Sequence, residues 1–170
     1  MKTEHIIKRA TLDDLNSLAE LFDSYRNFYK KESAIEEAKQ FLKERITNNE
    51  SVIFVSFNQQ NIMTGFVQLY PLFSSTRMKR LWLLNDLFVR ADYRGLRISV
   101  ALINKAKHLC YETNACGLTL ETAKTNDIGN QLYPLMEFIL DEDHNFYYWD
   151  IKLNADLSPA LSLPTDSLTL

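Results

Sequence analysis

A short arginine-containing turn lies between two apolar segments, and its residue types suit the binding of a phosphate or diphosphate. Before it, residues 80–89 are apolar on both alternating faces, which predicts a strand buried on both sides. After it, apolar residues recur at helical spacing from Ile98 onward, which predicts a helix packed against the sheet. A helix opening at Ser99 leaves backbone N–H groups free. Its dipole and Arg94, in the Arg94-Gly95 turn, place positive charge at the same point.

A single carboxylate, Asp86, interrupts the apolar residues of the predicted strand. Carboxylates are rarely buried without a partner, and a buried one often has a function. In one interpretation Asp86 takes part in proton transfer. In the other it is a structural residue that accepts hydrogen bonds from a loop backbone. Both interpretations stay open at the level of sequence.

Composition bounds the class of protein. The chain has 170 residues, of which 46% are hydrophobic and 24% charged, as expected for one globular domain. Its net charge of -3 disfavours nucleic acid as a partner. No apolar run approaches the ~20 residues that cross a bilayer, so no membrane contact is expected. Residues 1–9 lack a signal-peptide core, so the expected location is cytoplasmic.

Neither a metal site nor a disulfide is expected. Cys110 and Cys116 are the two cysteines, and in a reducing compartment they are interpreted as small reduced side chains. The three histidines are scattered, and no spacing typical of a Cys–His metal site is present.

The elements that position these residues alternate between strand and helix patterns. The chain is predicted to begin with a strand at 5–10, helices from Thr11 and from Ser33, and strands at 51–57, 62–70 and 80–89. A helix from Ser99, a strand at 117–122, a helix at 128–138 and strands at 138–140 and 146–153 are predicted to follow. Periodicity alone therefore supports a mixed α/β class.

Four local expectations follow from turn and loop residues. The polar tetrapeptide 58–61 predicts a hairpin, and Gly65 predicts a bulge or a close backbone contact. Residues 71–79 are predicted to be a loop. The acidic turn 141–145 is predicted to join the last two strands into a hairpin.

The turn and the strand before it resemble a known family. Residues 94–99, Arg-Gly-Leu-Arg-Ile-Ser, are similar to the coenzyme A diphosphate loop of the GNAT acyltransferases, whose pattern is Arg/Gln-x-x-Gly-x-Gly/Ala. Residues 85–89 and 92–93 are similar to the strand and turn before that loop, particularly in the diamine acetyltransferase branch. Arg97 stands where the family has Gly, and Ser99 where it has Gly or Ala.

A second segment supports the same resemblance. In the family, a later helix has Asn near its start and Leu/Phe-Tyr-x-x-x-Gly-Phe at its end. This chain has Asn126, then Leu132-Tyr133, then Glu137-Phe138, so Glu137 replaces the glycine. Two motifs at the family spacing carry more weight than either alone.

The resemblance implies the α/β GNAT fold for residues 1–153, with 154–170 as a C-terminal tail. The implied sheet is mostly antiparallel, and its fourth and fifth strands, 80–89 and 117–122, are splayed. Acetyl-CoA would lie in the V between them.

The resemblance also implies which groups hold the donor. Backbone groups of the fourth strand would pair with the pantetheine arm, and one N–H would stabilise the oxyanion. Arg94 and the amides that follow it would hold the diphosphate. The implied cofactor-binding residues are Leu87, Phe88, Val89, Arg94, Gly95, Leu96, Arg97, Ile98, Ser99, Val100 and Asn126.

Two residues receive catalytic roles through the resemblance. Tyr133 would protonate the departing thiolate, because a tyrosine with a pKa of about 10 can donate to the anion of a thiol of about 8.5. Without the family spacing it would be interpreted as a core aromatic. Asp86 would accept the proton that an amine must lose, with Glu121 on the facing strand as a second candidate.

The acceptor side is predicted less specifically. Tyr29, Asn85 and Glu121 are the expected substrate-binding residues, and Asn85 stands where the diamine branch has a carboxylate. An aromatic set is expected to form the walls, although such residues at helical spacing are often core: Tyr25, Phe28, Tyr29, Tyr70, Phe73 and Trp82.

The resulting hypothesis is an N-acetyltransferase that moves an acetyl group from acetyl-CoA to a primary amine by direct attack. Two alternatives remain: a catalytically degenerate member that binds acyl-CoA and acts as a regulatory module, and a structural module that docks through residues 154–170. The resemblance also implies a homodimer, for which Trp149 and the apolar tail are candidate interface residues.

Overall fold

The computed structural model describes residues 5–151. Its elements, in chain order, are β1 (Ile6–Arg9), a 3-10 turn η1 (Leu12–Asp14), α1 (Leu15–Phe28), α2 (Ile35–Thr47), β2 (Val52–Phe57), β3 (Met63–Ser74), β4 (Lys79–Val89), a second 3-10 turn η2 (Ala91–Tyr93), α3 (Ile98–Glu112), β5 (Leu118–Leu120) and α4 (Asp127–Leu135). No helix within this part of the chain is long and apolar enough to cross a membrane.

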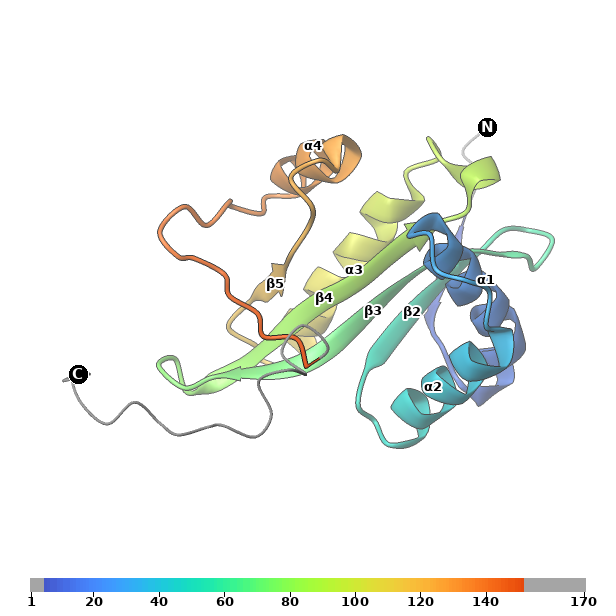
Figure 1. The fold of residues 1–170 in the computed structure, drawn as a ribbon, viewed down its shortest axis with the longest axis horizontal. Helices are drawn as coiled ribbons and strands as arrows, with labels where there is room; N and C mark the ends of the chain where they lie inside the picture. Colours follow the sequence, from blue (N-terminus) through green and yellow to red (C-terminus); the bar gives the residue numbers. More distant parts are fainter. Residues whose placement is uncertain (1–4, 152–170) are drawn as a thin grey trace.

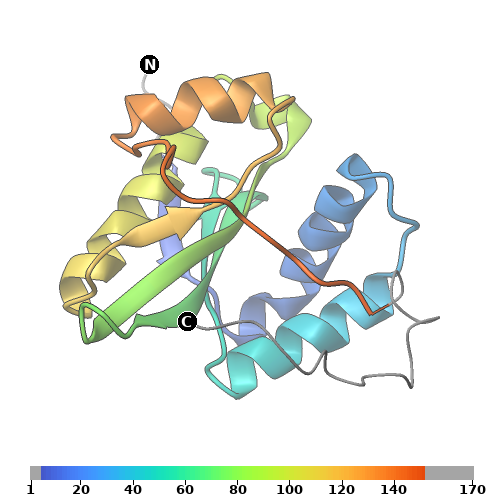
Figure 2. The same cartoon turned by 60° about the vertical axis from the view of Figure 1, so that its left-hand side comes forward.

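The strands form one sheet in the order β1-β2-β3-β4-β5. The first three pairs are antiparallel and β4 pairs with β5 in parallel, so the predicted mixed, mostly antiparallel sheet is confirmed. Figures 1 and 2 show α1 and α2 on one face of the sheet and α3 on the other.

Alternation along the central strands divides the core into two clusters. On β2, Val52 and Phe54 pack in the cluster that contains the apolar stripe of α3. Ile53 and Val55 pack in the cluster that contains α1 and α2. A strand whose side chains are apolar on both faces is the expected solution when helices cover both sides of a sheet. β4, in contrast, is buried mainly at alternate positions in its first half.

β4 and β5 separate after a short paired region. Their register covers only Trp82 to Leu84 opposite Leu118 to Leu120, whereas β4 continues to Val89. In Figure 1 the chain leaves β5 toward α4 while β4 runs toward α1. The splayed fourth and fifth strands are therefore confirmed, although β5 is shorter than the predicted 117–122.

A β-bulge at Asn85 changes which residues of β4 share a face. Gln68 pairs with Asp86 while the next residue, Leu69, pairs with Leu84, so Asn85 is the extra residue. Beyond the bulge, Leu87 packs with the α3-side cluster and Phe88 with the α1-side cluster. Strict alternation along 80–89 would place Phe88 on the same face as Leu84, but the inserted residue puts the two side chains on opposite faces.

The predicted loop 71–79 is wrong over most of its length. β3 continues to Ser74 and pairs with β4 as far as Lys79. Pro71 is tolerated because its partner Trp82 donates its own N–H to the carbonyl of Gly117, just before β5. The pair is therefore not hydrogen-bonded, and the missing N–H of Pro71 faces away from β4.

Gly65 fulfils both sequence expectations. The β2–β3 register shifts next to it, between Ser56 and Phe57. A Cβ at Gly65 would lie 2.8 Å from the Phe88 carbonyl oxygen, a distance that real side chains essentially never show. The close approach of β3 and β4 therefore requires a glycine here.

The predicted C-terminal hairpin is wrong in the described residues. Neither 138–140 nor 146–151 is a strand, and residues 139–151 run as an extended segment after α4 (Figure 2). Phe138 is held by the end of α4, because its N–H bonds to the Tyr133 carbonyl. β5 also offers an edge of only three residues. Lys152, Leu153 and the predicted tail 154–170 lie outside the described residues.

Candidate functional site

Two cavities of about 340 and 440 Å³ adjoin each other where β4 and β5 separate. Five residues line both of them: Tyr25, Tyr29, Leu87, Asn126 and Tyr133. The first, which we name the turn cavity, extends to the turn before α3. The second, which we name the strand cavity, extends between β4 and the chain that follows β5. The two predicted motifs, far apart in sequence, thus meet at one site.

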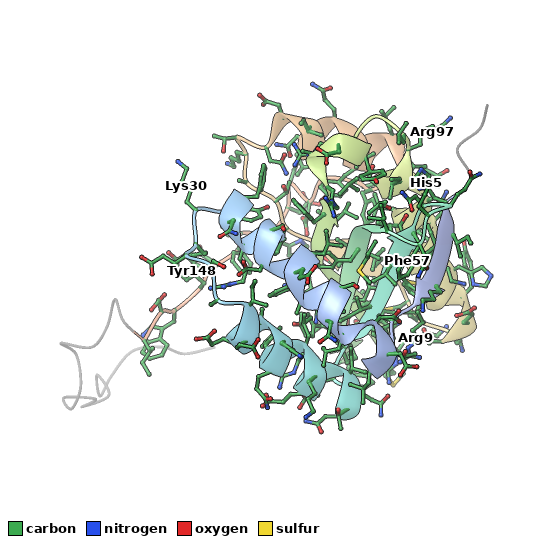
Figure 3. The ribbon with its side chains drawn as sticks, turned by 90° about the vertical axis from the view of Figure 1, so that its right-hand side faces the viewer. His5, Arg9, Lys30, Phe57, Arg97 and Tyr148 are labelled. Atoms are coloured by element: carbon green, nitrogen blue, oxygen red, sulfur yellow. The ribbon has the colours of Figure 1, made fainter. Side chains whose placement is uncertain are left out.

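The turn before α3 requires left-handed backbone at two positions. Gly95 has φ of 78° and Arg97 has φ of 61°. Arg97 is also the N-cap residue of α3, and Figure 3 labels it beside the start of that helix. A non-glycine residue in this conformation costs about 1 kcal/mol. The glycine expected at position 97 is therefore explained by backbone conformation, which Arg97 reproduces.

Arg94 is oriented by two contacts. Its Nε donates to the Val89 carbonyl over 3.3 Å, and its guanidinium lies 5.4 Å from the centre of the Phe28 ring. These contacts join the end of β4 to α1 and hold a positive charge at the wall of the turn cavity. Such a group suits an anionic ligand.

Most of the predicted cofactor-binding residues lie around the turn cavity. Its lining includes Leu87, Phe88, Val89, Arg94, Gly95, Arg97, Ile98, Ser99 and Asn126. Leu96 and Val100 are not among the lining residues: the Leu96 side chain is exposed, and Val100 packs against the α3-side cluster. Any role for these two residues would have to come from their backbone amides.

Backbone direction separates the three predicted residues of β4. The Arg90 N–H bonds to the Thr64 carbonyl of β3. By alternation, the backbone groups of Phe88 also face β3, and those of Leu87 and Val89 face the open side. Only Leu87 and Val89 therefore offer backbone groups toward the separation between β4 and β5.

Asp86 is buried, with 6% of its surface exposed, and lies behind the cavity wall. The Tyr25 hydroxyl donates to Asp86 Oδ1 over 2.7 Å, and Asn85 Nδ2 donates to Oδ2 over 3.0 Å. Its partners are thus side chains, so the alternative in which a loop backbone satisfies it is wrong. Burial raises the pKa of Asp86, against the opposing effect of these two hydrogen bonds.

The tyrosines around Asp86 respond to its charge. Burial, followed by the Asp86 carboxylate, raises the pKa of Tyr25. The same two causes raise the pKa of Tyr70 to about 12. Both phenols therefore stay protonated at neutral pH, and each can act as a hydrogen-bond donor.

Tyr133 is positioned by the C-terminal cap of α4. The Phe138 N–H bonds to the Tyr133 carbonyl over 3.0 Å and the Glu137 N–H bonds to the Pro134 carbonyl over 2.9 Å. This pattern is a Schellman motif, in which Glu137 occupies the left-handed position with φ of 63°. The motif's apolar contact is the edge-on packing of Phe138 on Tyr133, with ring centres 5.7 Å apart.

The surroundings of Tyr133 keep its hydroxyl protonated. Burial raises its pKa, with a smaller contribution from Tyr29. Glu137, which replaces the family's glycine, is exposed and pairs with Lys107 over 2.9 Å on α3. The substitution at 137 therefore preserves the cap that orients Tyr133.

Asn126 has a local structural role at the start of α4. Its Oδ1 accepts the Gly129 N–H over 3.1 Å, and its Nδ2 donates to Thr122 Oγ1 over 2.8 Å. A Cβ at Gly129 would lie 2.5 Å from Asn126 Nδ2, so any larger residue there would displace the Asn126 side chain. Both polar groups of Asn126 are thus engaged, while its side chain lines both cavities.

The predicted substrate-binding residues Tyr29, Asn85 and Glu121 all line the strand cavity. Of the expected aromatic walls, Tyr25, Phe28 and Tyr29 line one or both cavities, but Tyr70, Phe73 and Trp82 do not. Trp82 is buried in the α3-side cluster, where its Nε1 donates to Thr113 Oγ1. Phe73 is 72% exposed and lies under Arg80.

Several lining residues were not predicted as site residues: Tyr93, Ile128, Gly129, Leu132, Leu84, Thr122 and Ala123. Tyr93 and Leu132 belong to the two segments that carry the resemblance, so their motifs were the available signal. Ile128 and Gly129 depend on where α4 lies relative to the end of β4, and Leu84, Thr122 and Ala123 depend on the separation of β4 and β5, and no local pattern predicts either. No cluster of metal-ligating side chains is present among residues 5–151.

Comparison with known proteins agrees with this geometry. Residues 15–138 match the acetyltransferase (GNAT) family. The chain is 37% identical over 149 residues to the uncharacterized N-acetyltransferase YhfO of Bacillus subtilis, covering 88% of this chain and 98% of that one. It is 34% identical over 111 residues to a probable acetyltransferase of Haemophilus influenzae, covering 65% of this chain and 76% of that one.

A solved structure supports the fold independently. The crystal structure of a probable acetyltransferase superposes with a TM-score of 0.82 at 35% sequence identity, covering 86% of this chain and 97% of that one. The family match extends over both motifs and the strands between them. This chain therefore belongs to the GNAT family of acetyltransferases.

Proposed function

We propose that this acetyltransferase moves the acetyl group of acetyl-CoA to a primary amine, borne by a small molecule or a peptide, by direct attack within a ternary complex. The observation that carries the proposal is the pair of adjoining cavities that share Tyr25 and Tyr133 as walls. The donor can occupy the turn cavity and the acceptor the strand cavity, so that they meet at the shared walls.

The turn cavity fits the donor. Arg94, the Arg97 side chain and the free N–H groups at the start of α3 present positive charge to a diphosphate. Leu87 and Val89 present backbone groups on the open side of β4, where an extended pantetheine arm can pair with a strand edge. When bound, the thioester supplies an activated acetyl carbonyl and a thiolate leaving group.

Three groups of this chain would then perform the transfer. The Leu87 N–H polarises the acetyl carbonyl and stabilises the charge that develops on its oxygen. The Tyr133 hydroxyl donates a proton to the departing sulfur, and its raised pKa keeps this donor form populated. Because a phenol is a weaker acid than a thiol, the donation has to accompany cleavage of the C–S bond. Asp86 is the final acceptor of the proton that the amine loses.

The strand cavity fits an amine. Tyr25 and Tyr29, at the C-terminal end of α1, line it together with Glu121, which directly follows β5. Aromatic faces and a carboxylate both attract an alkylammonium group. Asn85 stands in place of the carboxylate of the diamine branch, which weakens the case for a polyamine and favours a monoamine or a peptide amine.

Thiol release with acetyl-CoA over a panel of monoamines, diamines and short peptides tests the proposal. Turnover on at least one amine is expected, and Tyr133→Phe should reduce kcat while donor affinity measured by calorimetry is retained. Full activity in Tyr133→Phe would show that the proton-donor assignment is wrong. Binding of acetyl-CoA without turnover on any amine would favour the alternative, a degenerate member that acts through acyl-CoA binding.

The backbone at the two substituted glycine positions argues for the enzyme over that alternative. Arg97 and Glu137 both adopt the left-handed conformation for which glycine is usual. The diphosphate turn and the α4 cap are therefore intact. A homodimer and a cytoplasmic location remain predictions from the sequence.

A further inference from the structure

Asp86, the proposed proton acceptor, lies behind the cavity wall. It is absent from the lining of both cavities, whereas its chain neighbours Asn85 and Leu87 line the strand cavity. The bulge at Asn85 turns the Asp86 side chain toward α1 and away from the separation between β4 and β5. An amine in the strand cavity therefore needs a group that connects it to Asp86.

Tyr25 has the required position. Its ring lines both cavities, and its hydroxyl donates to Asp86 Oδ1 over 2.7 Å. The ring is packed edge-on against Tyr29, Phe66 and Phe88, with ring centres 5.1 to 5.8 Å apart. The phenol oxygen is thus fixed beside the carboxylate and retains two lone pairs that can accept a proton.

We propose that Tyr25 relays the amine's proton to Asp86, an inference that rests on the proposed function. The acceptor first loses its ammonium proton to solvent and attacks as the neutral amine. As the nitrogen bonds to the acetyl carbon, an N–H bond breaks and the proton forms a bond to Tyr25 Oη. The proton already on Tyr25 Oη passes at the same time to Asp86 Oδ1. Tyr25 ends the step neutral, Asp86 ends it protonated, and the proton that Tyr133 gives to sulfur completes the balance. Asp86 and Tyr133 return to their starting forms by exchange with solvent.

The charges around Asp86 suit the end of such a relay. The titratable groups near this region include Tyr25 and Tyr29 at the end of α1, Tyr70 on β3 and Tyr133 on α4. Arg45 and Glu50 act on Tyr70, and Asn85 on β4 is neutral. Burial raises the pKa of Asp86, which makes the carboxylate a stronger base than an exposed one. The relay operates only while Asp86 is ionised. Proton transfer through Tyr25 is therefore lost as pH falls through the raised pKa of Asp86.

Kinetics of Tyr25→Phe test the relay. Loss of a general base reduces rates by ~10²–10⁴-fold, so we expect kcat to fall by about 100-fold with a smaller change in KM. The log of the remaining rate should rise with pH over the range where the wild type is level, because solvent must then remove the proton. In mixtures of H2O and D2O, the wild type should show two protons in motion in this step and the variant fewer.

Two further variants separate relay from structure. Asp86→Asn keeps an acceptor for the Tyr25 hydroxyl, and should lose kcat to the same extent as Tyr25→Phe. The double variant should lose no more, because both residues serve one path. Tyr70→Phe is the matched control: it removes a phenol near Asp86 that makes no hydrogen bond to it and lines neither cavity, so its kcat and pH profile should match the wild type.

The outcomes are distinct. A wild type that acetylates an amine while Tyr25→Phe keeps its rate and pH profile would overturn the relay and leave the proposed function standing. Losses that multiply in the double variant would also overturn the relay. A wild type that acetylates no amine would overturn both. If Tyr25→Phe fails to fold, by circular dichroism, the pH profile of Asp86→Asn decides: an unchanged level region is contrary to the relay.

Discussion

The turn before α3 and the C-terminal end of α4 contain the same left-handed backbone conformation but different side chains. Both have a non-glycine residue with φ near 60° where the family has glycine: Arg97 in the turn and Glu137 in the cap. Arg97 lines the turn cavity, and its guanidinium makes no ion pair with a carboxylate in residues 5–151. Glu137 is exposed, pairs with Lys107, and lines neither cavity.

The difference shows that one departure from a motif can matter for ligand binding and another only for the local fold. A left-handed position constrains the backbone, and glycine is preferred because it has no Cβ. A side chain at that position then points wherever the local backbone directs it. At 97 it adds positive charge to the wall of the turn cavity, and at 137 it pairs with Lys107 of α3 outside both cavities.

The largest expected effect concerns the residue that the α4 cap positions. Tyr133→Phe keeps the Schellman motif and the ring contact with Phe138, but removes the proton donor. We expect kcat to fall about 100-fold or more with acetyl-CoA affinity unchanged. Steady-state kinetics and calorimetry check this, and a variant with unchanged kcat would place the α4 end outside the chemistry.

A smaller loss is expected from the cap's own apolar contact. Phe138→Ala removes the ring that packs edge-on against Tyr133 and leaves the hydroxyl in place. We expect kcat to fall about 10-fold, because a misplaced catalytic group costs less than a missing one. Phe138→Leu, which retains apolar volume, is the control and should recover much of the rate. Equal rates for all three proteins would mean that the Tyr133 ring is positioned by its other neighbours.

In the turn, Arg97→Gly should separate charge from backbone. We expect the Kd for acetyl-CoA to rise about fivefold, with a weaker dependence on salt, because a charge beside the diphosphate is lost. The free energy of unfolding should rise by about 0.5–1 kcal/mol, since glycine adopts φ of 61° without strain. Arg97→Ala should lose affinity equally without that gain, as calorimetry and chemical denaturation would show. An unchanged Kd in both variants would place Arg97 outside the donor site.

The smallest effect is expected at the other left-handed residue. Glu137→Gly relieves the same backbone strain but breaks an exposed ion pair with Lys107, so the two changes in stability oppose each other. We expect kcat and KM within twofold of the wild type and a small change in the thermal midpoint. A Kd for acetyl-CoA that rises as much as in Arg97→Gly would remove the contrast between the two regions.

Sequence analysis predicted the site better than the surrounding strands. The Arg94-Gly95 turn and the Tyr133 segment carry local patterns, and both line the turn cavity. The partner of Asp86 was not predictable, because Tyr25 lies 61 residues away in the sequence, on helix α1. The strand pairing of 71–74 was missed, since a proline obscures a strand unless its hydrogen-bonding position is known.

By itself, the sequence determined the order of helices and strands from β1 to α4, the position of the positive turn and the segment that contains Tyr133. These are local properties, set by periodicity, capping and residue type within a few positions. Only the tertiary structure decided that the bulge at Asn85 turns Asp86 toward Tyr25, and that β4 and β5 separate after Leu84. Register and bulges depend on how whole strands pack against both layers of helices, so the direction of each buried side chain is settled by contacts that are distant in sequence.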